Sequence, residues 1–320
     1  MKKPILIWSG INGAGNDTLY EDVGQCIEVW EGRRKLLESK GIELKLLVPR
    51  RSIRMSGDLP ELPVIEHFAE KSPDMLVSLP GSRRNHLAEI YDQQLNWPRD
   101  SFLDLKSQIF SSDSDTGDIN LMMTNLNVGK PLTYSTIGEG GLSIGFDHTL
   151  ILSARERYPV RELDKEMLKN MGYRVFVMPV MDNLAIKPSH DDSHLLFRRM
   201  NGNGHLDTEL NILEKNSRER TLMVNLEYYN VFQSEVEVLA SQIGADIHVI
   251  TKSMDIMGKA LNYITLPDGS IIASEKNEET VRYLVDRLGK DRVHPIELFR
   301  REDNLDNGGG GLRCRTNLLY

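Results

Sequence analysis

The hydrophobic pattern in the second half of the chain repeats one order of elements. From about Gly138 onward, two extended apolar runs are followed by an amphipathic stretch and then by another extended run. Alternation with a period of two is typical of strands, and apolar spacing near 3.6 is typical of helices. The pattern therefore predicts repeated strand–strand–helix–strand units.

Three such units are predicted, each with three strands and one helix. In chain order, the strands are Leu142–Ile144, Thr149–Ser153, Arg174–Met178, Leu206–Leu213, Thr221–Leu226, Ile247–Ile250, Leu261–Leu266, Ile271–Ser274 and Val293–Leu298. The helices are Leu163–Met171, Ser234–Ile243 and Glu278–Leu288. Asn277 and Gly289 stand where an N-cap residue and a residue after a helix end belong.

The two ends of the chain supply the parts of a further unit. Leu312–Leu319 reads as a strand with no helix after it, and Ile5–Trp8 reads as a strand before a helix over Tyr20–Ser39 and a strand over Glu43–Val48. Pairing the two end strands would close a ring of units and remove exposed sheet edges. The alternative is an ordinary open α/β sheet. No composition break marks a linker, so residues 1–320 are expected to form a single domain.

The composition narrows the class of protein. A chain of 320 residues with 40% hydrophobic and 27% charged residues is typical of a soluble globular protein. A net charge of −8 argues against a nucleic-acid surface and is compatible with a cationic small substrate. Two cysteines exclude a disulfide framework, and no apolar run is long enough for a signal peptide or a membrane span. We therefore expect a cytoplasmic protein whose thiols are reduced.

The richest chemical signal lies near the C-terminus. Four consecutive glycines, Gly308, Gly309, Gly310 and Gly311, precede Leu312-Arg313-Cys314. A glycine run beside a single thiol is typical of a catalytic nucleophile under a gating loop. The alternative is a flexible tail with a buried structural cysteine.

Several acidic residues stand in segments that can accompany such a nucleophile. Asp100 follows Trp97-Pro98-Arg99, and Glu139 stands among glycines ahead of a strand. His205 and Asp207 are one residue apart at the expected start of a strand, which would place both side chains on one face. Each also has an ordinary explanation as a turn or a surface pair. Their occurrence together with Cys314 favours a shared chemistry.

That chemistry is the attack of a thiolate on a guanidinium. A guanidinium is planar, cationic and rich in N–H donors, so two carboxylates can hold it and fix its central carbon. A thiolate then attacks that carbon while a histidine protonates the departing nitrogen.

The motifs resemble those of the guanidine-modifying enzymes of the pentein fold, and most closely the arginine deiminases. Gly-Gly-Gly-Gly-x-Arg-Cys matches at Gly308–Cys314, and His-Leu-Asp-Thr matches at His205–Thr208. Arg99–Asp100 and Glu139–Gly141 match shorter motifs, and Asn262–Asn277 is similar to the penultimate repeat. The resemblance covers about residues 96–320.

The resemblance implies a five-bladed, pseudo-symmetric α/β propeller of ββαβ units. It implies Asp100 and Asp207 as the guanidinium clamp, His205 as general acid and then base, Glu139 as its support, and Cys314 as nucleophile. Ammonia leaves, a covalent amidino intermediate forms, and water releases a ureido product such as citrulline. The implied reaction needs no metal and no cofactor.

The substrate is less narrowly defined than the reaction. Arg155 stands where arginine deiminases carry an arginine for the substrate α-carboxylate, although it also reads as a surface arginine. Arg313, beside the nucleophile, is a second candidate. Dimethylarginine hydrolases and amidinotransferases share the core residues, so these reactions remain alternatives. The sequence leaves open whether the chain forms a homo-oligomer.

Two hypotheses of other classes remain. His190 and His194 stand four residues apart with acids between them, so that with His205 and Asp207 they form the candidate ligand set of a metal-dependent hydrolase. The second hypothesis is a non-catalytic binding module of the same fold.

The irregular segments Asn183–Gly204 and Phe299–Gly311, each just before a candidate catalytic residue, are predicted to be lids.

Overall fold

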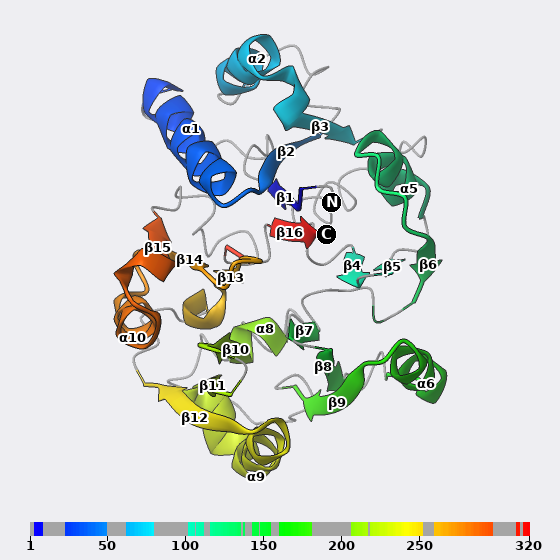
Figure 1. The fold of residues 1–320 in the computed structure, drawn as a ribbon, viewed down its shortest axis with the longest axis vertical. Coiled ribbons are helices and arrows are strands. Elements are labelled where there is room, and N and C mark those ends of the chain that lie inside the picture. Colours follow the sequence, from blue (N-terminus) through cyan, green and yellow to red (C-terminus); the bar gives the residue numbers. More distant parts are fainter. Residues whose placement is uncertain are drawn as a thin grey trace, which may run out of the picture. The chain divides into compact units, whose positions relative to one another are not determined.

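Five small sheets contain the strands that the structure describes (Figure 1). The structure is a computed structural model. It describes residues 3–8, 23–49, 62–79, 102–105, 107–111, 116–135, 137, 143–146, 148–154, 160–180, 206–216, 218–251, 259–296, 312–313 and 316–320. The chain divides into two compact units. Unit 1 comprises Met1–Glu139, Phe299–Glu302 and Cys314–Tyr320, and unit 2 comprises Gly140–Leu298 and Asp303–Arg313. The expectation of a single domain stays a prediction.

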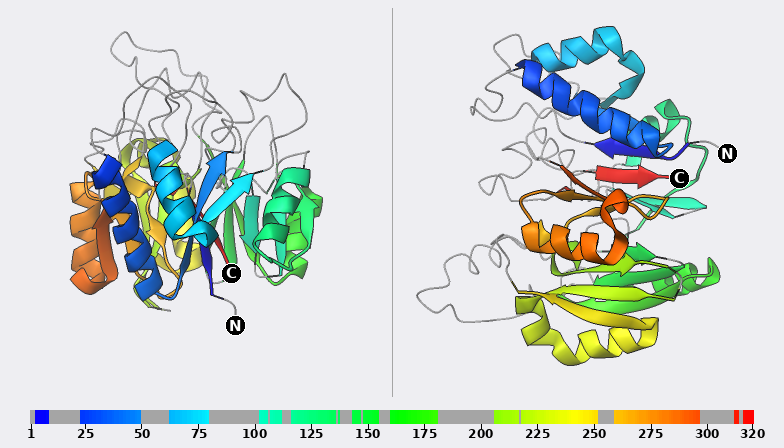
Figure 2. Two further views of the ribbon diagram at one scale, coloured as in Figure 1. Left: turned by 90° about the horizontal axis from the view of Figure 1, so that it is seen from above. Right: turned by 60° about the vertical axis from the view of Figure 1, so that its left-hand side comes forward.

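The first sheet of unit 1 joins the two ends of the chain. Its strand order is β16 (Thr316–Leu319), β1 (Ile5–Trp8), β2 (Glu43–Pro49) and β3 (Leu76–Leu79). β1 runs antiparallel to β16, and the parallel strands β2 and β3 follow on its other side. Figure 2 shows β1 and β16 side by side. The predicted pairing of the two end strands is confirmed, and the closed ring remains a prediction.

Two helices accompany this sheet, α1 (Val23–Ser39) and α2 (Leu62–Lys71), with the short 3-10 helix η1 (Pro73–Met75) after α2. In α1, the guanidinium of Arg33 lies 4.6 Å from the ring of Trp8 and 4.5 Å from the ring of Trp30, so a cation bridges helix and strand. Cys26 is buried in the same helix, as expected for an apolar structural cysteine.

The hydrophobic pattern does not predict the second sheet of unit 1. It consists of β4 (Phe102–Leu105), β5 (Gln108–Ser111) and β6 (Leu132–Tyr134), with α5 (Thr116–Asn125) between β5 and β6. β4 and β5 are antiparallel, and β5 and β6 are parallel. This is again a ββαβ unit, built on strands too short and too irregular for the pattern to reveal.

Unit 2 contains the three predicted ββαβ units. Their bounds are β7 (Ser143–Phe146), β8 (Thr149–Ala154), α6 (Glu162–Asn170) and β9 (Arg174–Pro179); β10 (Leu210–Glu214), β11 (Arg220–Asn225), α9 (Leu226–Ile243) and β12 (Ala245–Ile250); β13 (Ile264–Thr265), β14 (Ile271–Ser274), α10 (Glu278–Leu288) and β15 (Val293–Ile296). Two 3-10 helices, η5 (Lys259–Leu261) and η6 (Lys290–Arg292), flank the last unit. In each sheet the first two strands are antiparallel and the last two parallel, which confirms the predicted unit.

Two boundaries differ from the predictions for local reasons. α9 begins at Leu226 rather than Ser234, because the side chain of Asn225 caps the helix by accepting a hydrogen bond from the backbone N–H of Glu227 at 3.0 Å. β10 begins at Leu210 rather than Leu206, because the four residues Leu206–Glu209 form a short helix, α8.

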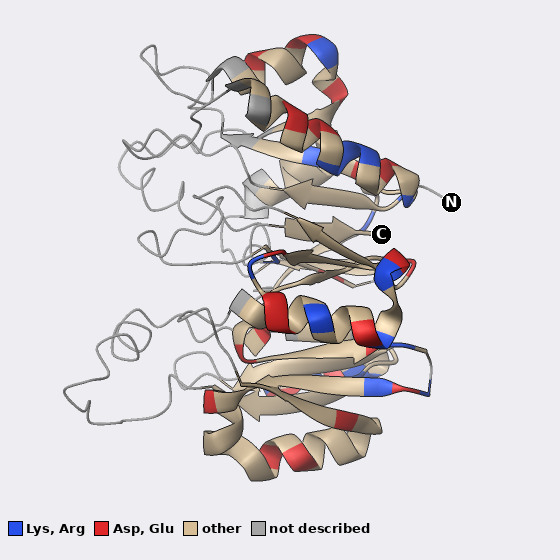
Figure 3. Ribbon diagram, turned by 90° about the vertical axis from the view of Figure 1, so that its left-hand side faces the viewer, with Lys and Arg blue, Asp and Glu red and all other residues tan. Residues whose placement is uncertain are grey.

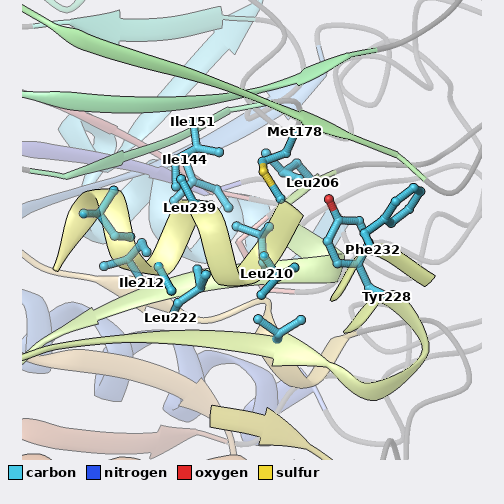
Figure 4. Packing of buried hydrophobic residues seen from close by; sticks show 14 residues of the cluster. Ile144, Ile151, Met178, Leu206, Leu210, Ile212, Leu222, Tyr228, Phe232 and Leu239 are labelled. Atoms are coloured by element: carbon cyan, nitrogen blue, oxygen red, sulfur yellow. The ribbon is translucent and has the colours of Figure 1, made fainter. Parts of the chain in front are cut away.

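A hydrophobic cluster in unit 2 connects α8 to its neighbours. Leu206 and Leu210 are fully buried among side chains of β7, β8, β9, β10, β11 and α9, including Ile151, Met178 and Tyr228 (Figure 4). The hydroxyl of Tyr228 donates a hydrogen bond to the backbone oxygen of Pro179 at 2.6 Å, so α9 is also fixed to the end of β9. This cluster holds the turn that contains Asp207.

Charged residues gather on the helices rather than on the strands (Figure 3). α10 shows this well, with Glu278 and Glu279 in its first turn and Arg287 in its last, the arrangement that the helix dipole favours. Among the described residues, no helix is long and apolar enough to cross a membrane.

Candidate active site

The structure describes two of the predicted site residues, Asp207 and Arg313, and both belong to unit 2. The other predicted site residues lie outside the described residues, so their placement stays a prediction. They are Asp100, Glu139, Arg155, His205, Gly308, Gly309, Gly310, Gly311 and Cys314. The predicted lid Asn183–Gly204 also lies outside them, as does Phe299–Gly311.

Asp207 lies in the helical turn α8 and not at the start of a strand. The predicted start of a strand at Leu206 is therefore wrong, since Leu206–Glu209 are helical. His205 lies outside the described residues, so its orientation relative to Asp207 stays a prediction.

The carboxylate of Asp207 is a buried anion with unused acceptor capacity. Asp207 is 0% exposed, and neither of its side-chain oxygens has a hydrogen-bond partner in the described part of the chain. Oδ2 lies 3.8 Å from Nε of Arg313, which is close enough for an ion pair but too long for a hydrogen bond. At an effective dielectric constant of about 20, such a separation corresponds to an attraction of roughly 4 kcal/mol. The guanidinium of Arg313 therefore attracts the carboxylate without forming a hydrogen bond to it.

Arg313 is held at its backbone and at its side chain by two buried asparagines. Its Nη1 donates to Oδ1 of Asn211 at 3.2 Å. Its backbone N–H donates to Oδ1 of Asn262 at 2.6 Å and to the backbone oxygen of Asn262 at 3.3 Å. Nδ2 of Asn211 donates in turn to the backbone oxygen of Leu261 at 2.8 Å. These contacts connect β10, the segment before β13 and the residue that precedes Cys314.

Neither asparagine was a candidate in the sequence analysis. Each interrupts an apolar run, Leu210-Asn211-Ile212 and Leu261-Asn262-Tyr263, and a polar residue in such a run must find partners when it is buried. That requirement was the signal available in the sequence. The partner itself lies far along the chain and could not be read from the pattern.

Tyr263 adds a neutral phenol beside this network. Burial raises the pKa of Tyr263 above its ordinary value, and the positive charge of Arg313 opposes part of that rise. The hydroxyl donates to the sulfur of Met223 at 3.4 Å. The phenol of Tyr263 therefore stays uncharged near the guanidinium of Arg313.

The described residues offer no metal site. Within them, no group of three or more His, Cys, Asp or Glu side chains is arranged to hold a metal ion. Of the candidate ligands of a metal-dependent hydrolase, His190, His194 and His205 lie outside the described residues. That alternative stays a prediction.

Comparison with solved structures identifies proteins that have a similar fold. No protein-family model matches the sequence, and no curated protein is significantly similar to it. An agmatine deiminase from C. jejuni is similar with a TM-score of 0.56 and 15% identity, covering 100% of this chain and 93% of its own. An amidinotransferase of saxitoxin biosynthesis from Microseira wollei has a TM-score of 0.55 and 14% identity, covering 98% and 93%. DDAH from Pseudomonas aeruginosa, solved with citrulline, has a TM-score of 0.54 and 15% identity, covering 100% of both chains. Together with the repeated ββαβ units, these similarities show that the chain shares the fold of these three proteins.

Proposed function

We propose that this protein breaks a guanidinium C–N bond of a small substrate through a covalent intermediate on Cys314. The observation that carries the proposal is the Asp207 carboxylate, which is buried, accompanied by a cation and without hydrogen bonds in the described part of the chain. A planar cation with several N–H donors would satisfy such an acceptor. Proteins of the same fold named as deiminases and an amidinotransferase support the same general chemistry.

The proposed reaction has two halves. The thiolate of Cys314 forms a C–S bond to the guanidinium carbon, and the C–N bond breaks as ammonia leaves with a proton from His205. A water molecule then attacks the same carbon and gives a proton to His205. The C–S bond breaks, which releases the ureido product and regenerates the thiolate. Glu139 would support His205.

Around the substrate guanidinium, the charges of the two carboxylates and of the two guanidinium groups would balance. The substrate guanidinium and Arg313 each carry one positive charge, while Asp100 and Asp207 each carry one negative charge. Two carboxylates are therefore required if a cationic substrate is to bind beside the fixed cation of Arg313. This balance favours the proposed role of Asp100 as the second arm of the clamp.

Arginine or an arginine-like compound is the proposed substrate, with Arg155 as the candidate ligand of its α-carboxylate. Because the similar structures include an agmatine deiminase, an amidinotransferase and a dimethylarginine dimethylaminohydrolase, two alternatives use the same residues. They are transfer of the amidino group to an amine and hydrolysis of a methylated arginine.

A product assay tests the proposal. Purified protein is incubated with arginine, agmatine, methylated arginines and guanidino acids, with and without an amine acceptor, and ammonia, methylamines and ureido products are measured. We expect a ureido product from at least one of these compounds and loss of turnover in Cys314→Ser. Turnover that needs the amine acceptor would identify an amidinotransferase instead. A Cys314→Ser variant that keeps most of the activity would overturn the nucleophile assignment, and activity that disappears on chelation would favour the metal-dependent alternative.

A further inference from the structure

Arg313 is placed to act on Asp207 rather than on a substrate. Its guanidinium is only 14% exposed, with Nη1 bonded to Asn211 and Nε 3.8 Å from Asp207. Its backbone N–H is bonded to Asn262, which is itself buried. Backbone and side chain are thus fixed independently, and the side chain is directed at the carboxylate.

The geometry points to Arg313 as a positioning residue that lies against Asp207, offsets its negative charge and holds it in place, and not as a ligand of the substrate carboxylate. This inference rests on the proposed function, in which Asp207 binds the guanidinium. A separation of 3.8 Å lets the cation stabilise the charge without occupying an acceptor site on the carboxylate. A direct hydrogen bond would instead compete with the substrate for the same lone pairs.

Hydrogen bonds to Asn211 and Asn262 fix the distance between Arg313 and Asp207. Arg313 cannot move closer to Asp207 without losing the bond from Nη1 to Asn211 or the bond from its backbone to Asn262. Both asparagines are buried, so losing either bond would remove a hydrogen bond from a buried position. The same backbone bond fixes the residue that immediately precedes Cys314.

Alkylation of Cys314 separates the two roles of Arg313 without needing the natural substrate. Chloroacetamidine carries a planar amidinium that Asp207 would hold, and chloroacetamide is its neutral analogue; neither carries a carboxylate. In the full-length protein we expect faster alkylation by the amidine. We expect Arg313→Met to lower the amidine rate by about tenfold or more and to leave the chloroacetamide rate nearly unchanged, because only the amidine carries a charge for Asp207 to hold. Arg313→Lys, which keeps the charge, should restore part of the preference.

Arg315→Met is the matched control, since it removes the same charge on the other side of Cys314 in the sequence. An equal loss of amidine preference in this variant would show a general charge effect and overturn the inference. An unchanged amidine preference in Arg313→Met would also overturn the inference. If turnover of arginine by this variant falls while turnover of agmatine does not, the result assigns Arg313 to the substrate carboxylate. A fall in the chloroacetamide rate of Arg313→Met would also overturn it, since the effect would then lie on the thiol or the fold. If the unmodified protein itself shows no amidine preference, the proposed function fails and this inference with it.

Discussion

At the scale of single residues, the carboxylate of Asp207 is the most unusual feature of the described chain. Buried charges are normally hydrogen-bonded, and an ionised carboxylate without such bonds lowers stability. Here the nearby cation of Arg313 offsets part of that cost, and no residue that the structure describes donates a hydrogen bond to the carboxylate oxygens. Such an arrangement is useful when a ligand completes it, which is why we connect Asp207 with binding rather than with folding.

Replacing the carboxylate by an amide should therefore harm function more than stability. We expect Asp207→Asn to lower kcat/KM by an amount equivalent to roughly 2–5 kcal/mol, because one partner of a buried charge pair is lost. Its free energy of unfolding should change by less than this amount, because the lost attraction to Arg313 is offset by the lower cost of burying a neutral amide, and no hydrogen bond within the described residues is removed. The measurement is steady-state kinetics with whichever guanidino compound is turned over.

Glu209→Gln is the control for this variant. Glu209 is buried in the same helical turn and contributes to raising the pKa of Tyr228, so the substitution makes the same chemical change two residues away. We expect a much smaller change in kcat/KM. Equal losses in the two variants would assign the effect to the turn as a whole and not to Asp207.

At the scale of elements, the third sheet of unit 2 is joined to the second by an aromatic contact. His248 of β12 stacks on Tyr283 of α10 with ring centroids 3.5 Å apart and an angle of 10° between the planes. Burial lowers the pKa of His248 below its ordinary value of 6.5, with Glu279 opposing the change and Arg287 adding to it. The contact thus favours the neutral imidazole.

This contact should make stability depend on pH. Because the folded protein disfavours protonated His248, the unfolded chain takes up a proton first as the pH falls below about 6.5, and stability is lost from there down to the lower pKa of the folded state. We expect His248→Phe, which keeps a stacking ring, to lose less stability than the unmodified protein between pH 7.5 and 5.5. Urea unfolding followed by circular dichroism at both pH values measures the difference.

Tyr283→Leu provides the matched comparison, since it removes the stacking partner and leaves His248 in place. Its pH dependence should also weaken, because the imidazole becomes better solvated. If His248→Phe instead loses as much stability as the unmodified protein, another group is responsible for the pH dependence.

At the scale of the whole molecule, the two ends of the chain are bound into one sheet. β16 pairs with β1, and the side chain of Asn317 donates to the backbone oxygen of Phe102 at 2.7 Å. The backbone N–H of Tyr320 donates to the buried carboxylate of Asp104 at 2.9 Å, and that carboxylate also accepts from Lys130 at 2.7 Å. The last strand therefore connects both sheets of unit 1.

Truncating one side chain of this strand should show how much it contributes. Leu319 is buried in the core of unit 1, so we expect Leu319→Ala to lower the free energy of unfolding by roughly 2–5 kcal/mol. Tyr320→Ala should change it by less than about 0.5 kcal/mol, because that side chain is exposed and its contact to Asp104 uses the backbone. The three tryptophans, Trp8, Trp30 and Trp97, all belong to unit 1, so their fluorescence in urea reports its unfolding. Similar values for the two variants would mean that β16 adds little to this unit.

Much of the fold could be predicted wherever the pattern was local. β14 and α10 have the predicted bounds, since a short apolar run and an amphipathic stretch that ends at Gly289 carry their own signals. The sheet of β4, β5 and β6 could not be predicted, because its strands are three or four residues long. At the candidate site, Asp207 and Arg313 were identified from motifs, whereas Asn211 and Asn262 depend on contacts between distant parts of the chain. Such long-range contacts produce no periodic pattern in the sequence.

The pairing of β1 with β16 also bears on how the chain emerges from the ribosome. Nearly all of the described chain is synthesised between these two strands, so the nascent protein must carry one open edge of β1 for most of its translation. Cys314 lies just two residues before β16. A polypeptide interrupted before β16 would leave this edge of β1 uncovered and would be prone to associate through it.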